Sequence, residues 1–267
     1  MYSVLMSVYY KEKAEYLNEA MESIWNQTVL TDDFVLVCDG PLTDELENVI
    51  ANNKKNHPQL NIVRLAKNSG LGVALNTGLK VCKNELVARM DSDDISLPRR
   101  CELQLNEFKT HPQISILSGV IEEFCDDEVQ SKRILPITME EIVPFSKKRN
   151  PFSHPAVMFK KTDVLKSGGY NERFHLLEDY YLWIRMFING YTGRNLTETI
   201  LKMRVPLDMF SRRGGTKYAK EIFKFFCWMK EIGWINYKEF FYGSILRVIY
   251  SMLPNNIKKI MFKLARK

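Results

Sequence analysis

The sequence predicts an α/β fold in which a mostly parallel central sheet is flanked by helices and followed by a helical C-terminal extension. Short apolar runs such as 2–8 and 34–38 alternate with segments such as 17–25, whose apolar residues recur at helical spacing. This alternation is typical of parallel strands joined by crossover helices. The 267 residues, of which 45% are hydrophobic, can bury one large core, or one domain with a small appendage.

The same periodicity places the individual elements along the chain. The expected strands are 2–8, 34–38, 62–66, 85–90, 114–120, 133–137, 152–159 and 194–205. The expected helices run through 17–25, about 43–53, from the glycine-rich turn near 70, from 97 onward, 139–148, from 178 onward and through the tail.

An acidic turn follows the apolar run 85–90. Asp91, Asp93 and Asp94 place three carboxylates within four residues. Like charges this close raise each other's pKa, and a divalent cation would relieve the repulsion. Mg²⁺ and Mn²⁺ prefer oxygen ligands, and ligands of open α/β sheets bind at strand ends. A solvated acidic turn that caps a helix is the alternative for these residues taken alone.

The net charge of +6 is unevenly distributed. Residues 216–267 contain eleven Lys or Arg and three Glu, a net charge of +8, which leaves −2 for residues 1–215. We therefore expect a domain over 1–215 that does not bind nucleic acid, and a basic, aromatic-rich tail over 216–267 that binds anions. Five scattered cysteines with no Cys-x-x-Cys pair fit small buried side chains in a reducing compartment.

The segment Arg-Met-Asp-Ser-Asp-Asp-Ile-Ser-Leu-Pro-Arg-Arg, residues 89–100, resembles the metal-binding segment of family 2 glycosyltransferases, and the resemblance extends to about Gly215. It implies the GT-A fold and a metal-dependent inverting transferase that moves a sugar from UDP to an acceptor hydroxyl. Asp93 would bind Mn²⁺ or Mg²⁺ directly, and Asp91 would hold the metal through water or the ribose.

The resemblance also assigns the nucleotide contacts. Asp39, at a strand end before a Gly-Pro turn, would accept a hydrogen bond from uracil; a turn aspartate is the alternative. The motif Asn-x-Gly-x-x-x-Ala-x-Asn-x-Gly, which starts at Asn68, would pack beside the nucleotide, although Gly72 and Gly78 are better explained by helix packing. The remaining expected contacts are Tyr9, Lys67 and Ser92, with Arg212 and Arg213 of a loop that would close over the diphosphate.

The acceptor side follows the same pattern. Glu178 and Asp179 open a helix, where acidic residues also complement the helix dipole. In the family this pair carries the catalytic base, which by position is Asp179, and Glu178 would orient the acceptor or the loop. His154 would line the site, and a structural histidine is equally compatible with the sequence.

The tail suggests how the acceptor is presented. Residues 255–267 alternate apolar and basic side chains at helical spacing, which is typical of an interfacial helix. We expect a lipid-linked saccharide acceptor, contact with the membrane surface at its cytoplasmic face, and a role in O-antigen, capsule or related polysaccharide synthesis. The tail could instead cap the domain. A nucleotidyltransferase of related fold and a non-catalytic scaffold that binds sugar nucleotides are the alternative functions.

Overall fold

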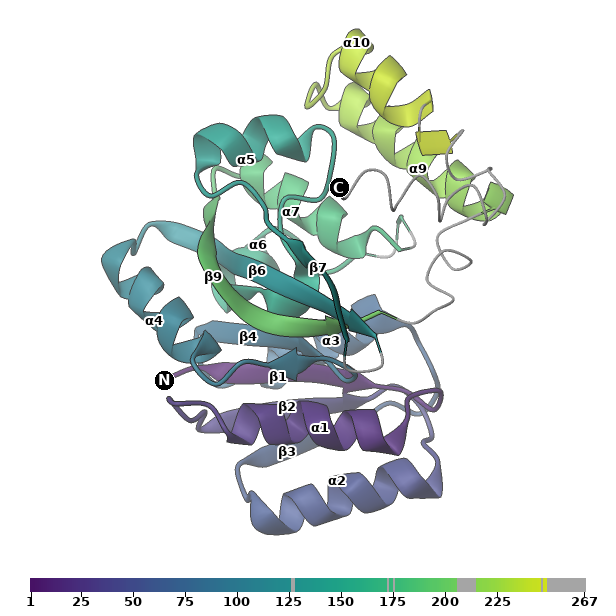
Figure 1. Ribbon diagram of the computed structural model, residues 1–267. Helices are drawn as coiled ribbons and strands as arrows, with labels where there is room; N and C mark the ends of the chain where they lie inside the picture. Colours follow the sequence, from purple (N-terminus) through teal and green to yellow (C-terminus); the bar gives the residue numbers. More distant parts are fainter. Residues whose placement is uncertain (126–127, 172, 175, 206–214, 246, 249–267) are drawn as a thin grey trace.

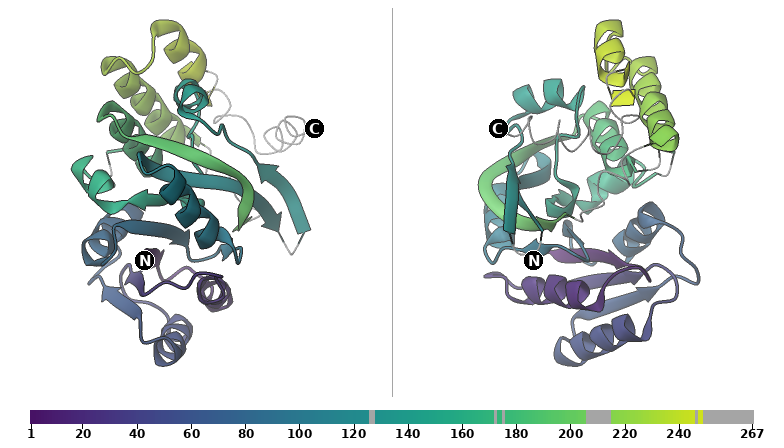
Figure 2. Two further views of the ribbon diagram at one scale, coloured as in Figure 1. Left: turned by 90° about the vertical axis from the view of Figure 1, so that its left-hand side faces the viewer. Right: turned by 45° about the vertical axis from the view of Figure 1, so that its right-hand side comes forward.

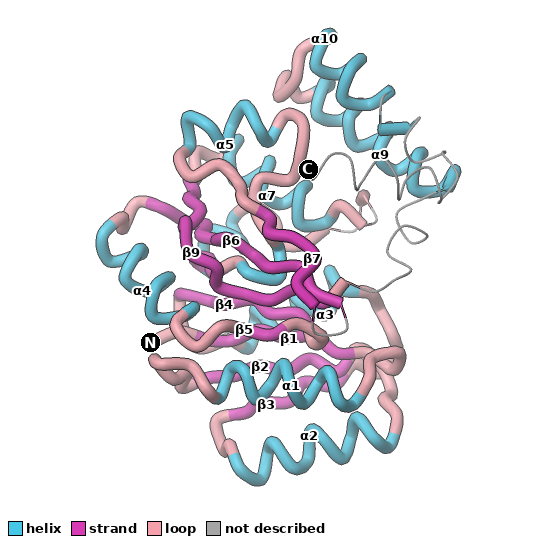
Figure 3. The backbone as a smooth tube through the Cα atoms, viewed as in Figure 1, coloured by secondary structure: helices cyan, strands magenta, loops and turns pink. Residues whose placement is uncertain are grey.

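The computed structural model describes residues 1–125, 128–171, 173–174, 176–205, 215–245 and 247–248 (Figure 1). Arg212, Arg213 and the expected interfacial segment 255–267 lie outside these residues. The fold is α/β, with a mixed central sheet between two layers of helices (Figures 2 and 3).

The first third of the chain alternates strands and helices as the sequence predicts. Its elements are β1 (Ser3–Val8), α1 (Ala14–Trp25), β2 (Asp33–Cys38), α2 (Asp44–Asn56), β3 (Leu60–Arg64), α3 (Leu71–Val81) and β4 (Leu86–Asp91). β1 and β2 are buried along almost their whole length, as parallel strands covered on both faces require.

The middle of the chain adds the antiparallel part of the sheet. Its elements are β5 (Ile95–Ser96), α4 (Arg100–Thr110), β6 (Ile114–Cys125), β7 (Glu128–Arg133), α5 (Met139–Ser146), the 3₁₀ turn η1 (His154–Ala156), β8 (Met158–Lys160), α6 (Lys161–Lys166), α7 (Glu178–Ile188) and β9 (Thr192–Arg204).

The strand order is β3-β2-β1-β4-β8-β6-β9-β5, with β7 paired to β6. β3, β2, β1 and β4 are mutually parallel, so their carboxyl ends meet at one edge of the sheet. In this register Val8 lies opposite Cys38, and Ser7 lies opposite Asp91. The loops after β1, β2 and β4 therefore converge, which is where an open α/β sheet binds its ligands.

Two hydrophobic cores cover the two faces of the sheet. One contains the buried sides of α1, α2 and α4, and the other contains those of α3, α7 and α9. Gly78 of α3 approaches the sheet so closely that an added Cβ would lie 2.3 Å from Cδ1 of Leu5, which confirms the packing explanation for this glycine. The described residues contain no disulfide, and Cys38, Cys82 and Cys101 are buried.

The described part of the tail packs into the second core. It comprises α9 (Gly215–Glu231), α10 (Tyr237–Phe240) and a π-helical turn (Phe241–Ile245). The ring centres of Phe225 in α9 and Tyr180 lie 4.7 Å apart, and those of Trp228 and Tyr181 lie 4.5 Å apart. The first turns of the tail thus act as a cap on α7. No helix in the described residues is long and apolar enough to cross a bilayer.

Three sequence predictions about the strands were wrong in detail. The expected strand 152–159 begins only at Met158, because His154–Ala156 forms a 3₁₀ turn whose second residue is a proline. The strand that returns from β6 is Glu128–Arg133, whereas the sequence predicted a strand over 133–137. β6 itself is longer than expected and continues to Cys125, because its second half pairs with both β7 and β9.

Candidate active site

The acidic turn after β4 forms a compact carboxylate cluster. Oxygen atoms of Asp91, Asp93 and Asp94 all lie within 4.8 Å of one another. Burial, reinforced by the charges of Asp91 and Glu12, raises the pKa of Asp93 to about 7. Burial and the two neighbouring aspartates also raise the pKa of Asp94 well above its usual value. An all-oxygen donor set with this surplus of negative charge fits a hard divalent cation.

The three aspartates of the cluster have different surroundings. Asp94 is buried, and its Oδ1 accepts a 2.8 Å hydrogen bond from the backbone N–H of Arg204, whereas its Oδ2 has no partner among the described residues. Asp91 pairs with the buried guanidinium of Arg89. The side chain of Asp93 makes no hydrogen bond to another residue within the described part of the chain, and it faces a pocket. Asp93 and Asp91 are therefore the residues that could hold a cation, while Asp94 ties the turn to β9.

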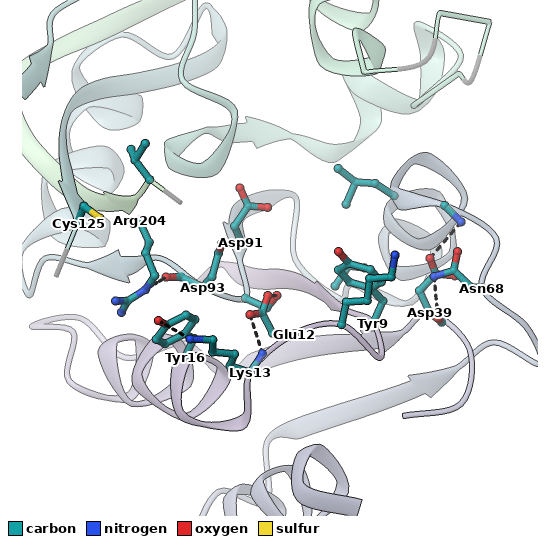
Figure 4. A pocket seen from close by; sticks show the side chains of 16 residues that line it. Tyr9, Glu12, Lys13, Tyr16, Asp39, Asn68, Asp91, Asp93, Cys125 and Arg204 are labelled. Carbon is teal, nitrogen blue, oxygen red and sulfur yellow. Dashed lines mark hydrogen bonds between the residues drawn. The ribbon is translucent and has the colours of Figure 1, made fainter. Parts of the chain in front are cut away.

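A pocket of about 750 Å³ opens beside this cluster. Asp93 and Arg204 lie at one end, and Asp39 and Asn68 lie at the other (Figure 4). The structure thus brings together six of the residues singled out from the sequence, namely Tyr9, Asp39, Asn68, Asp91, Ser92 and Asp93. Lys67 is exposed next to Asn68 but does not line this pocket.

Asp39 fixes the loop that precedes α3. Its two carboxylate oxygens accept backbone N–H groups, from Ser69 at 2.7 Å and from Gly70 at 3.0 Å. Gly40 is required in the turn that follows, because it has φ +89° and an added Cβ would lie 2.5 Å from the nitrogen of Asn68. The glycine-rich turn therefore offers these two N–H groups to a carboxylate. A turn that bound a phosphate would need these two N–H groups free.

Glu12 and Arg204 are among the pocket residues that were not anticipated from the sequence. Glu12, in the loop after β1, accepts a 2.8 Å hydrogen bond from the hydroxyl of Ser92, and Figure 4 shows it between Asp93 and Tyr9. Arg204, at the end of β9, donates from Nε to the carbonyl of Asp93 at 3.1 Å. Glu12 could have been suspected as a charged residue just after the first strand. Nothing local in the sequence marks Arg204.

A second group of polar residues surrounds the first turn of α7. The amide nitrogen of Asn150 donates a 2.5 Å hydrogen bond to Oδ2 of Asp179. Glu178 accepts the backbone N–H of Leu176 at 3.0 Å, and Leu176 has φ +67°, an unusual conformation for leucine. Both acidic residues are half-buried. Neither lines the pocket beside the aspartate cluster.

Tyr170 is affected by charges from both groups. Burial raises the pKa of its hydroxyl, the charge of Arg89 lowers it, and the charges of Asp179 and Asp91 raise it. That hydroxyl is 2.9 Å from Nε2 of His154. Burial and the nearby charge of Arg89 hold the pKa of His154 well below its usual value, so this histidine is neutral. His154 thus contacts Tyr170 from within the protein and does not line the pocket.

The backbone of Tyr170 is itself clamped to α3. Asn76 donates to its carbonyl at 2.6 Å and accepts its N–H at 2.9 Å. Asn76 is the second asparagine of the motif that starts at Asn68. The motif therefore links the pocket to the segment that leads into α7.

The fold is GT-A-like, and its acidic cluster lies at the carboxyl ends of the parallel strands. Residues 3–166 match the family model for glycosyl transferase family 2. The chain belongs to this family.

The chain is similar to known glycosyltransferases over almost its whole length. The chain is 36% identical over 270 residues to the amylovoran biosynthesis glycosyltransferase AmsE of Erwinia amylovora, covering 100% of both chains. It is also 36% identical over 263 residues to an Escherichia coli enzyme named UDP-Gal:alpha-D-GlcNAc-diphosphoundecaprenol beta-1,3-galactosyltransferase, covering 98% of this chain and 95% of the relative. The protein is accordingly a glycosyltransferase related to enzymes of bacterial polysaccharide synthesis.

Solved structures share the fold. The mannosyltransferase PcManGT of Pyrobaculum calidifontis, solved with GDP-Man and Mn²⁺, superposes with a TM-score of 0.65 at 18% identity, over 95% of this chain and 70% of the other. Residues 1–349 of S. aureus TarS, solved with UDP-GlcNAc, superpose with a TM-score of 0.64 at 17% identity, over 85% of this chain and 65% of the other.

Proposed function

We propose that the chain transfers a sugar from a UDP-sugar to a hydroxyl of a lipid-linked saccharide, with inversion at the anomeric carbon. The observation that carries this proposal is the pocket that joins Asp39 and Asn68 at one end to the aspartate cluster at the other. The names of relatives support the donor and acceptor classes, since the Escherichia coli relative uses UDP-Gal and a diphosphoundecaprenol-linked sugar.

The pocket accommodates the parts of a UDP-sugar in order. The uracil lies by Asp39, with Tyr9 and Asn68 around the base and Lys67 exposed next to Asn68. The ribose lies along the middle of the pocket, near Asp91 and Ser92. The diphosphate would lie at the cluster, where Asp93 and Asp91 would hold Mn²⁺ or Mg²⁺. Arg212 and Arg213, which lie outside the described residues, would add positive charge. A cation in that position supplies Lewis-acid stabilisation of the leaving diphosphate.

Asp179 takes the proton in this mechanism. The acceptor hydroxyl loses its proton to the Asp179 carboxylate as its oxygen attacks the anomeric carbon. The bond from that carbon to the diphosphate oxygen breaks on the opposite face, and UDP leaves with the electron pair. A single displacement of this kind inverts the configuration. The Asn150 amide and the first turn of α7 hold the Asp179 carboxylate in place.

The tail brings the enzyme to its acceptor in this proposal. The basic residues of 216–267 attract anionic lipid, and three aromatic side chains around α10 are exposed to solvent: Tyr237 by 77%, Phe241 by 57% and Tyr242 by 64%. Aromatic and basic side chains together favour the membrane interface. The enzyme would act as a peripheral protein at the cytoplasmic face of the membrane.

A screen of UDP-sugars for hydrolysis or transfer tests the proposal. At least one UDP-sugar should be turned over with Mn²⁺ or Mg²⁺ and not in EDTA. The Asp93→Ala variant should be inactive with the same sugar. Turnover of a nucleoside triphosphate with a sugar phosphate would instead indicate a nucleotidyltransferase, and binding of UDP without any turnover would indicate a scaffold.

A further inference from the structure

Three positively charged side chains gather beside the first turn of α7, and we call them the basic rim: Lys148, Arg149 and Arg247. Lys148 and Arg149 follow the end of α5 and are exposed. Arg247 comes from the C-terminal segment, 99 residues away in the sequence, and its guanidinium donates to the carbonyl oxygen of Lys148. Its guanidinium also lies 5.6 Å from the ring centre of Phe226, so two separate parts of the fold bring these charges together.

The basic rim forms no ion pair within the described residues, although Glu239 lies near enough for the charge of Lys148 to help lower its pKa. Lys147, the preceding residue, forms an ion pair with Glu239 at 3.2 Å. None of the three rim residues has a carboxylate within 4.0 Å in the part of the chain that the structure describes. Cations at the end of α5 would complement its dipole, but that explanation does not apply to Arg247, which lies on another element.

The basic rim is adjacent to the expected acceptor position. Asn150 directly follows Arg149, and its amide nitrogen lies 2.5 Å from Oδ2 of Asp179. A chain advances at most about 3.6 Å per residue, so the backbone of Lys148 lies within roughly 7 Å of that of Asn150. An anion attached to the far side of a sugar whose hydroxyl meets Asp179 would reach the rim.

We propose that the basic rim binds the diphosphate that links the acceptor sugar to its lipid carrier. The proposal rests on the proposed function, because it takes Asp179 as the residue that meets the acceptor hydroxyl. Two arginines and a lysine suit a diphosphate, since guanidinium groups bind phosphate oxygens in pairs and an ammonium group adds a point charge. The rim is separate from the donor pocket, none of whose lining residues it includes.

The elements next to the rim provide a route for the lipid. The Lys147–Glu239 ion pair ties α10 to the segment that carries Lys148 and Arg149. The exposed aromatic residues Tyr237, Phe241 and Tyr242 belong to α10 and the turn after it. A polyprenyl chain that leaves the diphosphate on this side would pass along aromatic surface toward the membrane.

The test titrates octyl diphosphate into the full-length protein saturated with UDP and Mn²⁺, so that the donor pocket is already filled. The Lys148→Gln/Arg149→Gln variant should bind octyl diphosphate at least about tenfold more weakly, because each lost charge-assisted hydrogen bond is worth about this factor or more. The Lys55→Gln/Lys109→Gln variant removes two exposed charges from α2 and α4, and it should bind as the wild type does. Arg247→Gln is a second, single-residue test of the rim.

Three outcomes would overturn the proposal. The first is equal octyl diphosphate affinity in the rim and control variants. The second is loss of UDP affinity in the rim variant, which would assign the rim to the donor site. The third combines two results: octyl diphosphate does not bind the wild type, and the rim variant no longer binds phosphatidylglycerol vesicles. Together they would assign the rim to membrane headgroups. Failure of UDP to bind the wild type with Mn²⁺ would refute the proposed function itself.

Discussion

The backbone N–H of Arg204 donates a 2.8 Å hydrogen bond to Oδ1 of Asp94, so the end of β9 is fastened to the turn after β4. The two residues are 110 positions apart in the sequence. This bond separates the roles of the neighbouring aspartates. The carboxylate of Asp94 connects two parts of the fold, while Asp93 faces the pocket.

Replacement of Asp94 should therefore affect stability. Asp94→Ala leaves the N–H of Arg204 without its acceptor, which costs about 1–3 kcal/mol when the group is buried. For a chain of this length each kcal/mol lowers the Tm by about 2–4 °C. Asp94→Asn keeps an acceptor oxygen and should melt close to the wild type. Thermal melts of the metal-free proteins check this, and equal melting of the alanine and asparagine variants would show that the bond contributes nothing.

Metal binding should depend on pH through Asp93. Its pKa of about 7 in the metal-free protein means that a cation must displace a proton at lower pH. The affinity for Mn²⁺ should therefore fall by up to about tenfold per unit as the pH drops below 7. Calorimetric titrations with Mn²⁺ at pH 6 and pH 8 measure this. A pH-independent affinity would mean that Asp93 is not a ligand.

The raised pKa of Asp93 also affects the stability of the metal-free protein. Because the folded state binds a proton on Asp93 more tightly than the unfolded state, the free energy of unfolding should decrease as the pH rises from about 4 to 7. Asp93→Asn cannot titrate and should remove this part of the pH dependence. Denaturant unfolding of both proteins in EDTA provides the comparison, and identical pH profiles would contradict the assignment of the shift to Asp93.

The two acidic residues at the start of α7 should differ in their kinetic effects. Asp179→Asn should retain UDP-sugar binding and lose about 10²–10⁴-fold in the rate of transfer, as expected when a general base is removed. Glu178→Gln should have a smaller effect, because Glu178 accepts the backbone N–H of Leu176 and supports the loop. Steady-state kinetics on both variants decide between them. The reverse order of effects would make Glu178 the base.

The end of the tail should be needed for membrane binding and not for chemistry. Deletion of residues 255–267 removes five basic residues, each worth about 1 kcal/mol near an anionic leaflet. The truncated protein should no longer sediment with anionic vesicles at low salt, and it should still transfer to a short soluble acceptor. High salt should weaken vesicle binding of the full-length protein. Equal sedimentation of the two proteins would show that residues 255–267 do not anchor the protein to the membrane and have a structural role instead.

The sequence predicted the parts of the fold that depend on local pattern. The apolar runs of β1, β2 and β4 and the helical spacing in α7 appear where they were expected, because buried strands and amphipathic helices each have a distinct period. The segment 152–159 misled the prediction, since its aromatic and β-branched residues favour a strand while Pro155 and packing of the loop impose a 3₁₀ turn.

The site was predictable where a single motif carries it. Asp91, Asp93 and Asp94 are adjacent in the sequence, so their crowding was visible without a structure. Arg204 and Tyr170 were not predictable, because their positions depend on contacts between residues about 110 and 94 positions apart. Such pairings are set by the sheet order and by the packing of α3 against the segment before α7.

The central claim is that the aspartate cluster binds a divalent cation and, through it, the diphosphate of a UDP-sugar. Calorimetric titration of UDP into wild type and Asp93→Ala, each with Mn²⁺ and with EDTA, tests this most directly. We predict that Mn²⁺ strengthens the binding of UDP to the wild type and that Asp93→Ala, although folded, shows the same weak affinity with Mn²⁺ as in EDTA. Equal enhancement by Mn²⁺ in the wild type and in Asp93→Ala would contradict the assignment of the metal site.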